Sequence, residues 1–185
     1  DRKKDEGTPL SSLVKALANY GAAAQNYFKY DNSELANSAL TEEEKAAVDA
    51  VTADMVQGYE YVKSGAAEGI TYNGATLVLE GATTIRQYYS VADGYNINDY
   101  TFKCGDEVLT PIKNGSMYYV EVKNIASKDL DTMYEVRVND TLSVQYAAMT
   151  YVQSKLNNAD TKAELVQLCK AIYLYNQAAN VYFKG

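Results

Sequence analysis

The hydrophobic period of this chain changes twice along its length, and this change restricts the fold more than any other feature of the sequence. Between Ile70 and Tyr146, short segments rich in β-branched and aromatic residues alternate with turn-forming pairs such as Asn73-Gly74 and Asn114-Gly115. On either side, apolar residues recur every three or four positions, as in amphipathic helices; the first such series is Leu10, Leu13, Val14, Leu17, Tyr20, Ala24 and Phe28. The pattern predicts helices at both ends and antiparallel strands between them.

The central segment predicts an immunoglobulin-like antiparallel β-sandwich of about seven short strands, because turn signals separate its strand-like segments at regular intervals. The segments with the strongest β pattern are Thr76–Glu80, Thr84–Val91, Asp99–Cys104, Met117–Lys123, Tyr134–Asn139 and Leu142–Tyr146. Tyr134 follows Leu130 and leads into one of these strands, a place that suits the corner hydrogen bond of immunoglobulin-like sandwiches. The predicted fold class is α+β, with the sandwich packed against a helical subdomain formed by the N- and C-terminal helices.

The two terminal helical segments resemble each other. Leu10–Lys29 and Leu165–Lys184 align without gaps, with ten identities in twenty positions that include the pair Tyr20 and Tyr175. This similarity predicts two helices that present equivalent faces to one core, since apolar stripes at helical spacing are normally buried. Thr41 and Glu44 have the spacing of a capping box. Further helices are predicted from Thr41 to about Val56, over Ala147–Leu156, and from about Asp160 or Thr161 to Phe183.

Four parts of the chain follow from these patterns. Residues 1–9 are charged and polar, which is typical of a linker inside a longer protein. Residues 10–69 form an N-terminal helical part, residues 70–146 the β-sandwich, and residues 147–185 a C-terminal helical part that packs with 10–69.

Composition excludes several classes of function. A net charge of -7 argues against binding to nucleic acid or to an anionic membrane surface. No apolar run reaches the roughly 18 to 20 residues that span a bilayer, so no membrane insertion is expected. The chain has no histidine, the most frequent general base and a common metal ligand. We therefore expect no catalytic residues, no metal site and no cofactor.

Two smaller features allow alternatives. Cys104 and Cys169 lie far apart in the sequence, and a buried free thiol at Cys169 is favoured over a disulfide because Cys169 lies on the apolar side of its helix. The loop Asp93–Asp99 gathers oxygen ligands that suit calcium, but the same residues are typical of ordinary turns and the loop lacks the spacing of an EF-hand. The turn interpretation is favoured.

Five segments carry a resemblance to one family: Leu17–Gln25, Leu77–Glu80, Thr84–Tyr89, Lys128–Val136 and Leu174–Ala179. They are similar to an uncharacterised module of large extracellular proteins from gut Clostridia of the Ruminococcus-like and Lachnospiraceae-like kinds. The resemblance covers nearly the whole chain from Leu10 onward. It implies a secreted or cell-surface location, with neighbouring domains of a larger chain such as dockerins, wall anchors or glycoside hydrolases. The family provides no functional residues that could be transferred to this sequence.

Tyrosine supplies the candidate binding residues, since the chain has 18 tyrosines and no tryptophan. In each adjacent pair within a strand, one ring is expected to face the core and one to face outward. An outward ring can stack on a sugar or anchor a protein contact, or simply pair across strands. The candidate ligand-binding residues are Tyr88, Tyr89, Tyr95, Tyr118 and Tyr119. The expected function is a non-catalytic extracellular binding module for polysaccharide; the alternatives are an adhesin that binds a surface protein and a structural spacer.

Overall fold

The computed structural model describes residues 7–30 and 33–185, and the chain divides into two units. The helical unit contains the described residues up to Gly58, together with residues 127–129 and 152–185. The sandwich unit contains residues 59–126 and 130–151. Most of the expected linker, residues 1–6, lies outside the described residues. Within the described part of the chain, no helix has the length and apolar character needed to span a membrane.

Helix α1 (Pro9–Phe28) starts where its capping residues place it. The Thr8 side chain accepts a hydrogen bond from the Ser11 N–H at 3.1 Å, and Pro9 occupies the first turn, where its missing N–H costs nothing. The helix ends at Lys29, which has left-handed backbone angles and donates its N–H to the Gln25 carbonyl. Thr8 and Pro9 therefore belong to the helix and not to the expected linker.

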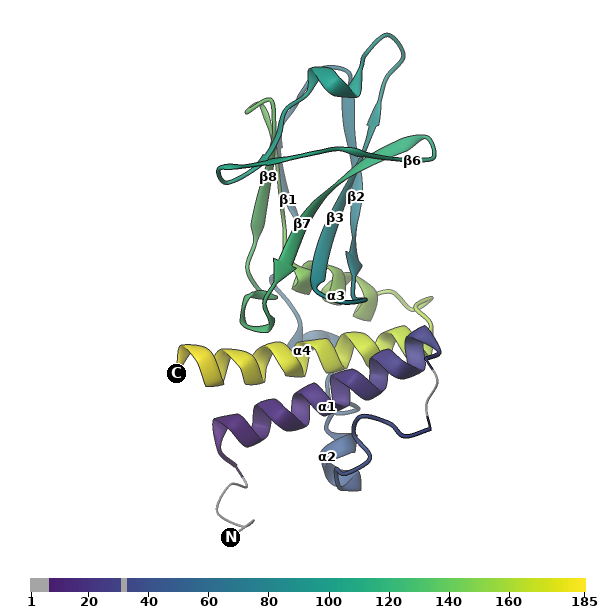
Figure 1. The fold of residues 1–185 in the computed structure, drawn as a ribbon, viewed down its shortest axis with the longest axis vertical. Helices are drawn as coiled ribbons and strands as arrows, with labels where there is room; N and C mark the ends of the chain where they lie inside the picture. The colour runs from purple at the N-terminus through teal and green to yellow at the C-terminus, as the bar shows by residue number, and fades with distance from the viewer. Residues whose placement is uncertain (1–6, 31–32) are drawn as a thin grey trace. The chain divides into compact units, whose positions relative to one another are not determined.

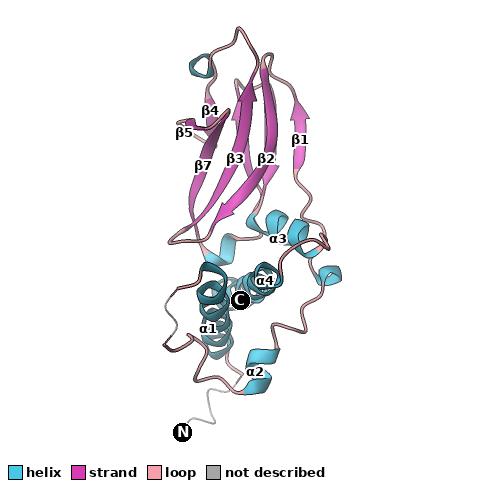
Figure 2. Ribbon diagram, turned by 90° about the vertical axis from the view of Figure 1, so that its right-hand side faces the viewer, coloured by secondary structure: helices cyan, strands magenta, loops and turns pink. Residues whose placement is uncertain are grey.

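Helix α4 (Ala163–Lys184) packs against α1 in antiparallel orientation (Figures 1 and 2). The rings of Tyr20 and Tyr175 stack with centroids 5.4 Å apart and an interplanar angle of 15°. Lys29, at the end of α1, lies 3.4 Å from the Glu164 carboxylate at the start of α4. Because Tyr20 and Tyr175 are equivalent in the sequence alignment, their contact relates the two helices by an approximate twofold axis.

The two similar helices nevertheless differ in burial, so the prediction that they present equivalent faces is only partly right. Helix α4 buries Leu168, Cys169, Ala171, Ile172, Asn176 and Ala179, whereas α1 buries only Ala16, Asn19 and Ala22. Leu17 is 47% exposed, although its equivalent Ile172 is only 2% exposed. The two helices have similar sequences, but the other residues of the helical unit bury α4 more than α1.

Residues 33–58 confirm the capping box but not the length of the helix after it. The Thr41 N–H donates to the Glu44 carboxylate at 2.8 Å, and the Thr41 hydroxyl accepts from the Glu44 N–H at 3.3 Å. Helix α2 (Glu42–Ala46) ends after five residues, and turns with a short helix η2 (Ala53–Met55) replace the helix expected to reach Val56. β-Branched residues weaken the helix here, and Val51 and Val56 are buried from turns instead.

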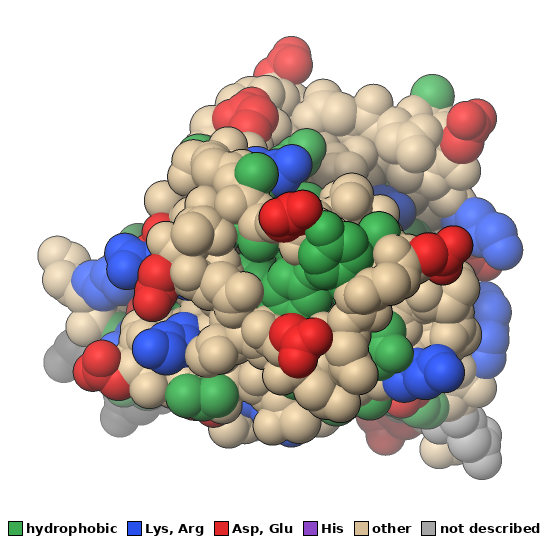
Figure 3. All heavy atoms as spheres, turned by 90° about the horizontal axis from the view of Figure 1, so that it is seen from above, with side chains coloured by type: hydrophobic (Ala, Val, Ile, Leu, Met, Phe, Trp, Pro, Cys, Tyr) green, Lys and Arg blue, Asp and Glu red, His purple; other side chains and the backbone are tan. Residues whose placement is uncertain are grey.

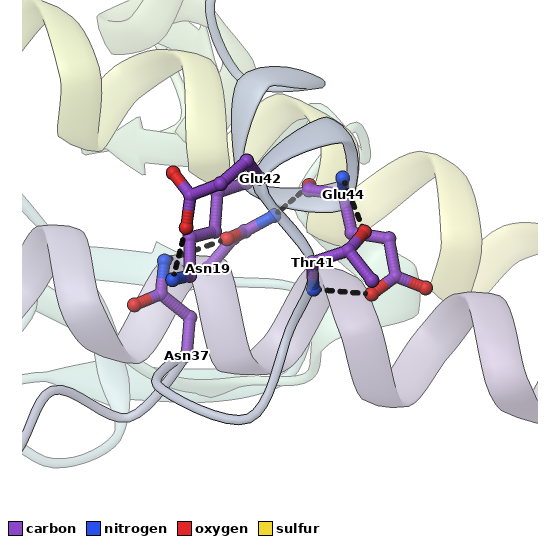
Figure 4. A network of polar contacts seen from close by, with 6 residues as sticks. Asn19, Asn37, Thr41, Glu42 and Glu44 are labelled. Atoms are coloured by element: carbon purple, nitrogen blue, oxygen red, sulfur yellow. Dashed lines mark hydrogen bonds and ion pairs between the residues drawn. The ribbon is translucent and has the colours of Figure 1, made fainter.

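A network of side-chain amides ties this segment to α1 (Figure 4). The Asn19 side chain donates to the Glu44 carbonyl at 2.9 Å, and the Asn37 side chain donates to the Asn19 side-chain oxygen at 2.9 Å. Asn19 is buried, so these bonds satisfy an amide that burial would otherwise penalise. They hold α2 and the turn that contains Asn37 on α1.

The sandwich unit contains two antiparallel sheets (Figures 1 and 2). In the five-stranded sheet the order is β1 (Val62–Gly65), β9 (Leu142–Tyr146), β8 (Tyr134–Val138), β4 (Phe102–Cys104) and β5 (Glu107–Leu109). In the four-stranded sheet it is β2 (Ile70–Val78), β3 (Thr83–Val91), β7 (Met117–Ile125) and β6 (Ile112–Asn114). A short helix η3 (Ile97–Asp99) lies between β3 and β4, and another, η4 (Ser127–Asp129), lies between β7 and β8. Helix α3 (Ala148–Leu156) follows the last strand, β9. The α+β class is confirmed.

Three of the nine strands in the described residues were not expected: β1, β5 and β6. They have three or four residues each and are largely exposed, so they lack the alternation that reveals a half-buried strand. Strand β1 lies within residues 10–69, which the sequence pattern had assigned to the helical part. Its pairing with β9 corrects that boundary to Tyr59.

The core of the sandwich unit lies between the two sheets. The Tyr89 ring of β3 meets the Phe102 ring of β4 edge-on, with centroids 5.2 Å apart. The Tyr89 hydroxyl donates to the Gln87 side-chain oxygen at 2.7 Å, and the Gln87 amide donates to the Val144 carbonyl of the other sheet at 3.4 Å. A buried polar pair therefore joins the sheets within an otherwise apolar core.

Both cysteines are free thiols. Cys169 is fully buried on α4, as expected, and burial raises the pKa of its thiol to about 12. A thiol with this pKa is protonated near neutral pH and packs as a small apolar side chain.

Candidate binding surface

The five candidate tyrosines occupy three different places in the sandwich unit. Tyr88 and Tyr119 are directly opposite each other on neighbouring strands of the four-stranded sheet. Tyr95 and Tyr118 line a depression at one end of the sandwich. Tyr89 has no exposed surface, so the expectation that it serves a ligand is wrong. Its neighbour Tyr88 faces away from the core, which agrees with the expected alternation of this pair.

The outer side of the four-stranded sheet carries a surface that we call the aromatic face: Arg86, Tyr88, Ile112, Tyr119 and Glu121. The strand register places Arg86 opposite Glu121, Tyr88 opposite Tyr119, and Tyr119 opposite Ile112. The two tyrosine rings lie 5.6 Å apart with an interplanar angle of 52°. The residues that alternate with these along the strands, including Gln87 and Val120, point the other way and are buried between the sheets. The face is therefore a row of cross-strand pairs on the solvent side.

Charged side chains surround Tyr119 of the aromatic face. The Arg86 guanidinium lies 4.5 Å from the centre of the Tyr119 ring, a cation–π contact. Its Nε is 2.8 Å from one oxygen of Glu121, and the Lys123 Nζ is 3.1 Å from the other. Partial burial raises the pKa of Glu121, but hydrogen bonds from Arg86 and Lys123 outweigh it, and the pKa lies below its ordinary value.

A glycine borders the aromatic face beside Tyr88. Gly74 of β2 lies opposite Tyr88, next to a β-bulge, with a φ of +114° that other residues rarely adopt. A side chain carbon placed at Gly74 would meet no atom within 4 Å. On its other side, Tyr88 is in contact with Tyr119.

The depression at the end of the sandwich has a volume of about 430 Å³. It is lined by the loop after β3 and by the β6–β7 hairpin: Val91, Ala92, Asp93, Gly94, Tyr95, Asn96, Ile97, Lys113, Gly115, Ser116 and Tyr118. Seen from above, the molecule exposes a group of hydrophobic side chains with acidic side chains around it, at the end where η3 lies (Figures 1 and 3). This surface is mixed in polarity.

Tyr95 is exposed but not free to move. Its hydroxyl donates to the Glu68 carboxylate at 2.7 Å, and this hydrogen bond raises the pKa of Tyr95. The ring lies against Gly69, where an added Cβ would sit 2.3 Å from the ring atoms. The neighbouring Tyr100 hydroxyl donates to the Glu68 carbonyl at 2.6 Å. These contacts hold the wall of the depression and leave the outer side of Tyr95 accessible.

The loop Asp93–Asp99 makes turn contacts. The Asn96 side-chain oxygen accepts from the Asn98 N–H at 2.9 Å and caps η3. No group of three or more histidine, cysteine or acidic residues that could hold a metal ion occurs within residues 7–30 and 33–185. The side-chain oxygen of Asn96 therefore has the role that a turn requires.

A second depression of about 410 Å³ lies on the five-stranded sheet and is lined by Lys103, Gly105, Asp106, Glu135, Arg137 and Asp140. Glu135 accepts hydrogen bonds from the Ser143 hydroxyl at 2.6 Å and from Arg137 at 3.0 Å. These bonds lower the pKa of Glu135, so it stays ionised in an exposed ion pair. The lining has no aromatic ring, and it suits a solvated sheet face.

Sequence reasoning missed Arg86, Ile112 and Glu121 as parts of the aromatic face, and Gly74 as its neighbour. The signal was available for two of them, because Arg86 precedes Tyr88 by two residues and Glu121 follows Tyr119 by two, which puts each on the same side of its strand. Gly74 could not be found in this way, since its place opposite Tyr88 depends on the register between strands.

No protein-family model matches the chain, and no curated protein or solved structure is significantly similar to it.

The ion pairs on the aromatic face predict a pH-dependent stability. Because the pKa of Glu121 is lowered by folding, its stabilisation is present above the unfolded pKa and is lost as the pH falls through the folded value. We expect Glu121→Gln to lower the free energy of unfolding by about 1 kcal/mol at pH 7 and by much less near pH 3. Urea denaturation at both pH values measures this. Glu107→Gln, an exposed strand carboxylate, is the matched control, and an equal loss for both variants at pH 7 would contradict the prediction.

Proposed function

We propose that this chain is a non-catalytic, carbohydrate-binding accessory module of a larger secreted or cell-surface protein, and that it binds glycan on the aromatic face. The observation that carries the proposal is the outward pair Tyr88–Tyr119, with the Arg86 guanidinium over the Tyr119 ring. The secreted or surface location is supported by the resemblance to extracellular modules of gut Clostridia.

The chemistry of the aromatic face suits a sugar. A pyranose ring has an apolar side that stacks on an aromatic ring and a hydroxyl rim that needs donors and acceptors. Tyr88 and Tyr119 provide aromatic surface, while Arg86 provides N–H donors beside it. Because Arg86 is already fixed by Glu121 and the Tyr119 ring, binding costs little additional side-chain entropy.

We further propose that the sandwich unit is immunoglobulin-like. The order β2-β3-β7-β6 corresponds to strands A-B-E-D of that fold, and β5-β4-β8-β9 corresponds to C′-C-F-G. Strand β1 is then an addition beside the last strand. In this correspondence Tyr134, at the start of β8, would take the place of the corner tyrosine.

A binding screen with matched variants tests the proposed function. The purified chain is screened against a glycan array and against insoluble plant, starch and mucin polysaccharides. We expect binding that weakens at least about tenfold in Tyr88→Ala and in Tyr119→Ala, because each removes one stacking ring. Tyr182→Ala on α4, which removes an exposed tyrosine of the helical unit, is the control and should bind normally. No binding across the panel by the folded protein would overturn the proposal.

Protein binding is a second candidate function, and an exposed apolar stripe on α1 favours it. Leu10, Val14 and Leu17 follow helical spacing and are 53%, 55% and 47% exposed. Such stripes are typical of interaction surfaces. If the glycan screen is negative, a Val14→Asp variant that loses adhesion to a bacterial or host surface, while Tyr88→Ala keeps it, would support this candidate. If both variants adhere as the wild-type protein does, neither surface is a binding site, and the spacer role is the remaining candidate.

A further inference from the structure

The depression at the end of the sandwich lies close to the aromatic face. On β3, Tyr88 belongs to the aromatic face and Val91 to the depression, three residues or about 10 Å along the strand. On β6, Ile112 pairs with Tyr119 of the aromatic face, and the next residue, Lys113, pairs with Tyr118 of the depression. The β6–β7 hairpin therefore contributes to both places, but Lys113 and Tyr118 point to the opposite side of the sheet from Ile112 and Tyr119, so a ligand that reaches both must pass over the hairpin.

The lining of the depression offers polar groups that no described residue uses. Asp93, Lys113 and Ser116 are exposed, and among residues 7–30 and 33–185 their side chains form no hydrogen bond or ion pair. Together they present a carboxylate, an ammonium and a hydroxyl, next to the rings of Tyr95 and Tyr118. The charges of Asp93 and Lys113 cancel, so the lining favours a neutral ligand with many hydroxyl groups.

Rigid walls support the same interpretation. Tyr95 is held by Glu68 and Gly69, and Ile97, which also lines the depression, is buried. A site with fixed aromatic rings and free polar groups binds without first ordering its own side chains. The volume of about 430 Å³ is within the range of ligand pockets.

We propose that the depression is a second subsite for the same glycan, and that the ligand is a neutral oligosaccharide chain extending from Tyr88–Tyr119 across the β6–β7 hairpin into the depression. This inference rests on the proposed function of the aromatic face. It adds that the module recognises several consecutive sugars and not a single terminal one. Affinity therefore depends on chain length.

Oligosaccharides of two and six sugars from cellulose, xylan, mannan and starch test this by calorimetric titration. For the series that binds, we expect the six-sugar chain to bind at least about tenfold more tightly than the two-sugar chain. In the triple variant Asp93→Ala, Lys113→Ala and Ser116→Ala, this advantage disappears while two-sugar binding is unchanged. The matched control is Asp106→Ala in the other depression, which keeps the advantage.

Two results would overturn the proposal in different ways. If Tyr88→Ala loses binding but the triple variant keeps the full length advantage, the depression is not a subsite and the proposed function stands. If neither these oligosaccharides nor the glycan array and polysaccharides of the first screen bind the folded wild-type protein, the proposed function fails, and the second subsite fails with it. Amide chemical shifts of Gly94 and Gly115 on titration with six-sugar chains provide an independent readout, since both residues line the depression.

Discussion

Replacing Tyr89 with alanine is expected to lower the free energy of unfolding of the sandwich unit by about 3–5 kcal/mol. The Tyr89 side chain is fully buried and makes ring contacts with Tyr72 on its own sheet and Phe102 on the other. Removing it leaves a large cavity between the sheets. It also leaves the Gln87 side-chain oxygen without the Tyr89 hydroxyl in a buried place.

Hydrogen exchange of β3 and β8 amides measures this loss for the sandwich unit separately from the helices. Tyr89→Phe keeps the ring and removes only the hydroxyl, so we expect a smaller loss of about 1–2 kcal/mol. Tyr88→Ala, the neighbouring substitution on the outer side, should cost less than Tyr89→Ala. A loss below about 1 kcal/mol for Tyr89→Ala would mean that the ring is not part of the core. If the loss is as large as expected, any effect of Tyr89→Ala on glycan binding is a consequence of destabilisation.

Gly69→Ala is expected to cost about 2–4 kcal/mol. Gly69 has a φ of +75°, which costs an alanine about 1–2 kcal/mol. The remaining loss of stability comes from a clash with the Tyr95 ring, because the new Cβ would lie 2.3 Å from it. To avoid this clash the ring must move, which breaks its hydrogen bond to Glu68. Urea denaturation followed by circular dichroism measures the change.

Two companion variants separate the backbone from the clash. Gly94→Ala lies in the loop after β3, has a φ of +87° and no atom within 4 Å of the added carbon, so it should show the backbone cost alone. In the double variant Gly69→Ala with Tyr95→Ala the clash is absent, and the total loss should be smaller than the sum of the single losses. Additive losses would contradict the packing of Tyr95 on Gly69.

The sequence predicted the parts of this protein whose signals are local. The period of apolar residues located α1, α4 and the long strands, because burial of one side of a helix or strand leaves a repeat in the sequence. Thr41 and Glu44 predicted the start of α2, since a capping box involves only four consecutive residues. The alternation of Tyr88 and Tyr89 across β3 followed from strand geometry.

The tertiary structure decided what depends on residues far apart in the chain. The short strands β1, β5 and β6 exist because longer neighbours pair with them, and their own residues carry no alternating pattern. The similar helices α1 and α4 differ in burial, since coverage depends on the rest of the unit and not on the helix itself. Strand register places Arg86 against Tyr119, and loop packing places Tyr95 against Gly69. Local sequence determines the elements, whereas contacts between distant residues determine the surface that a ligand meets.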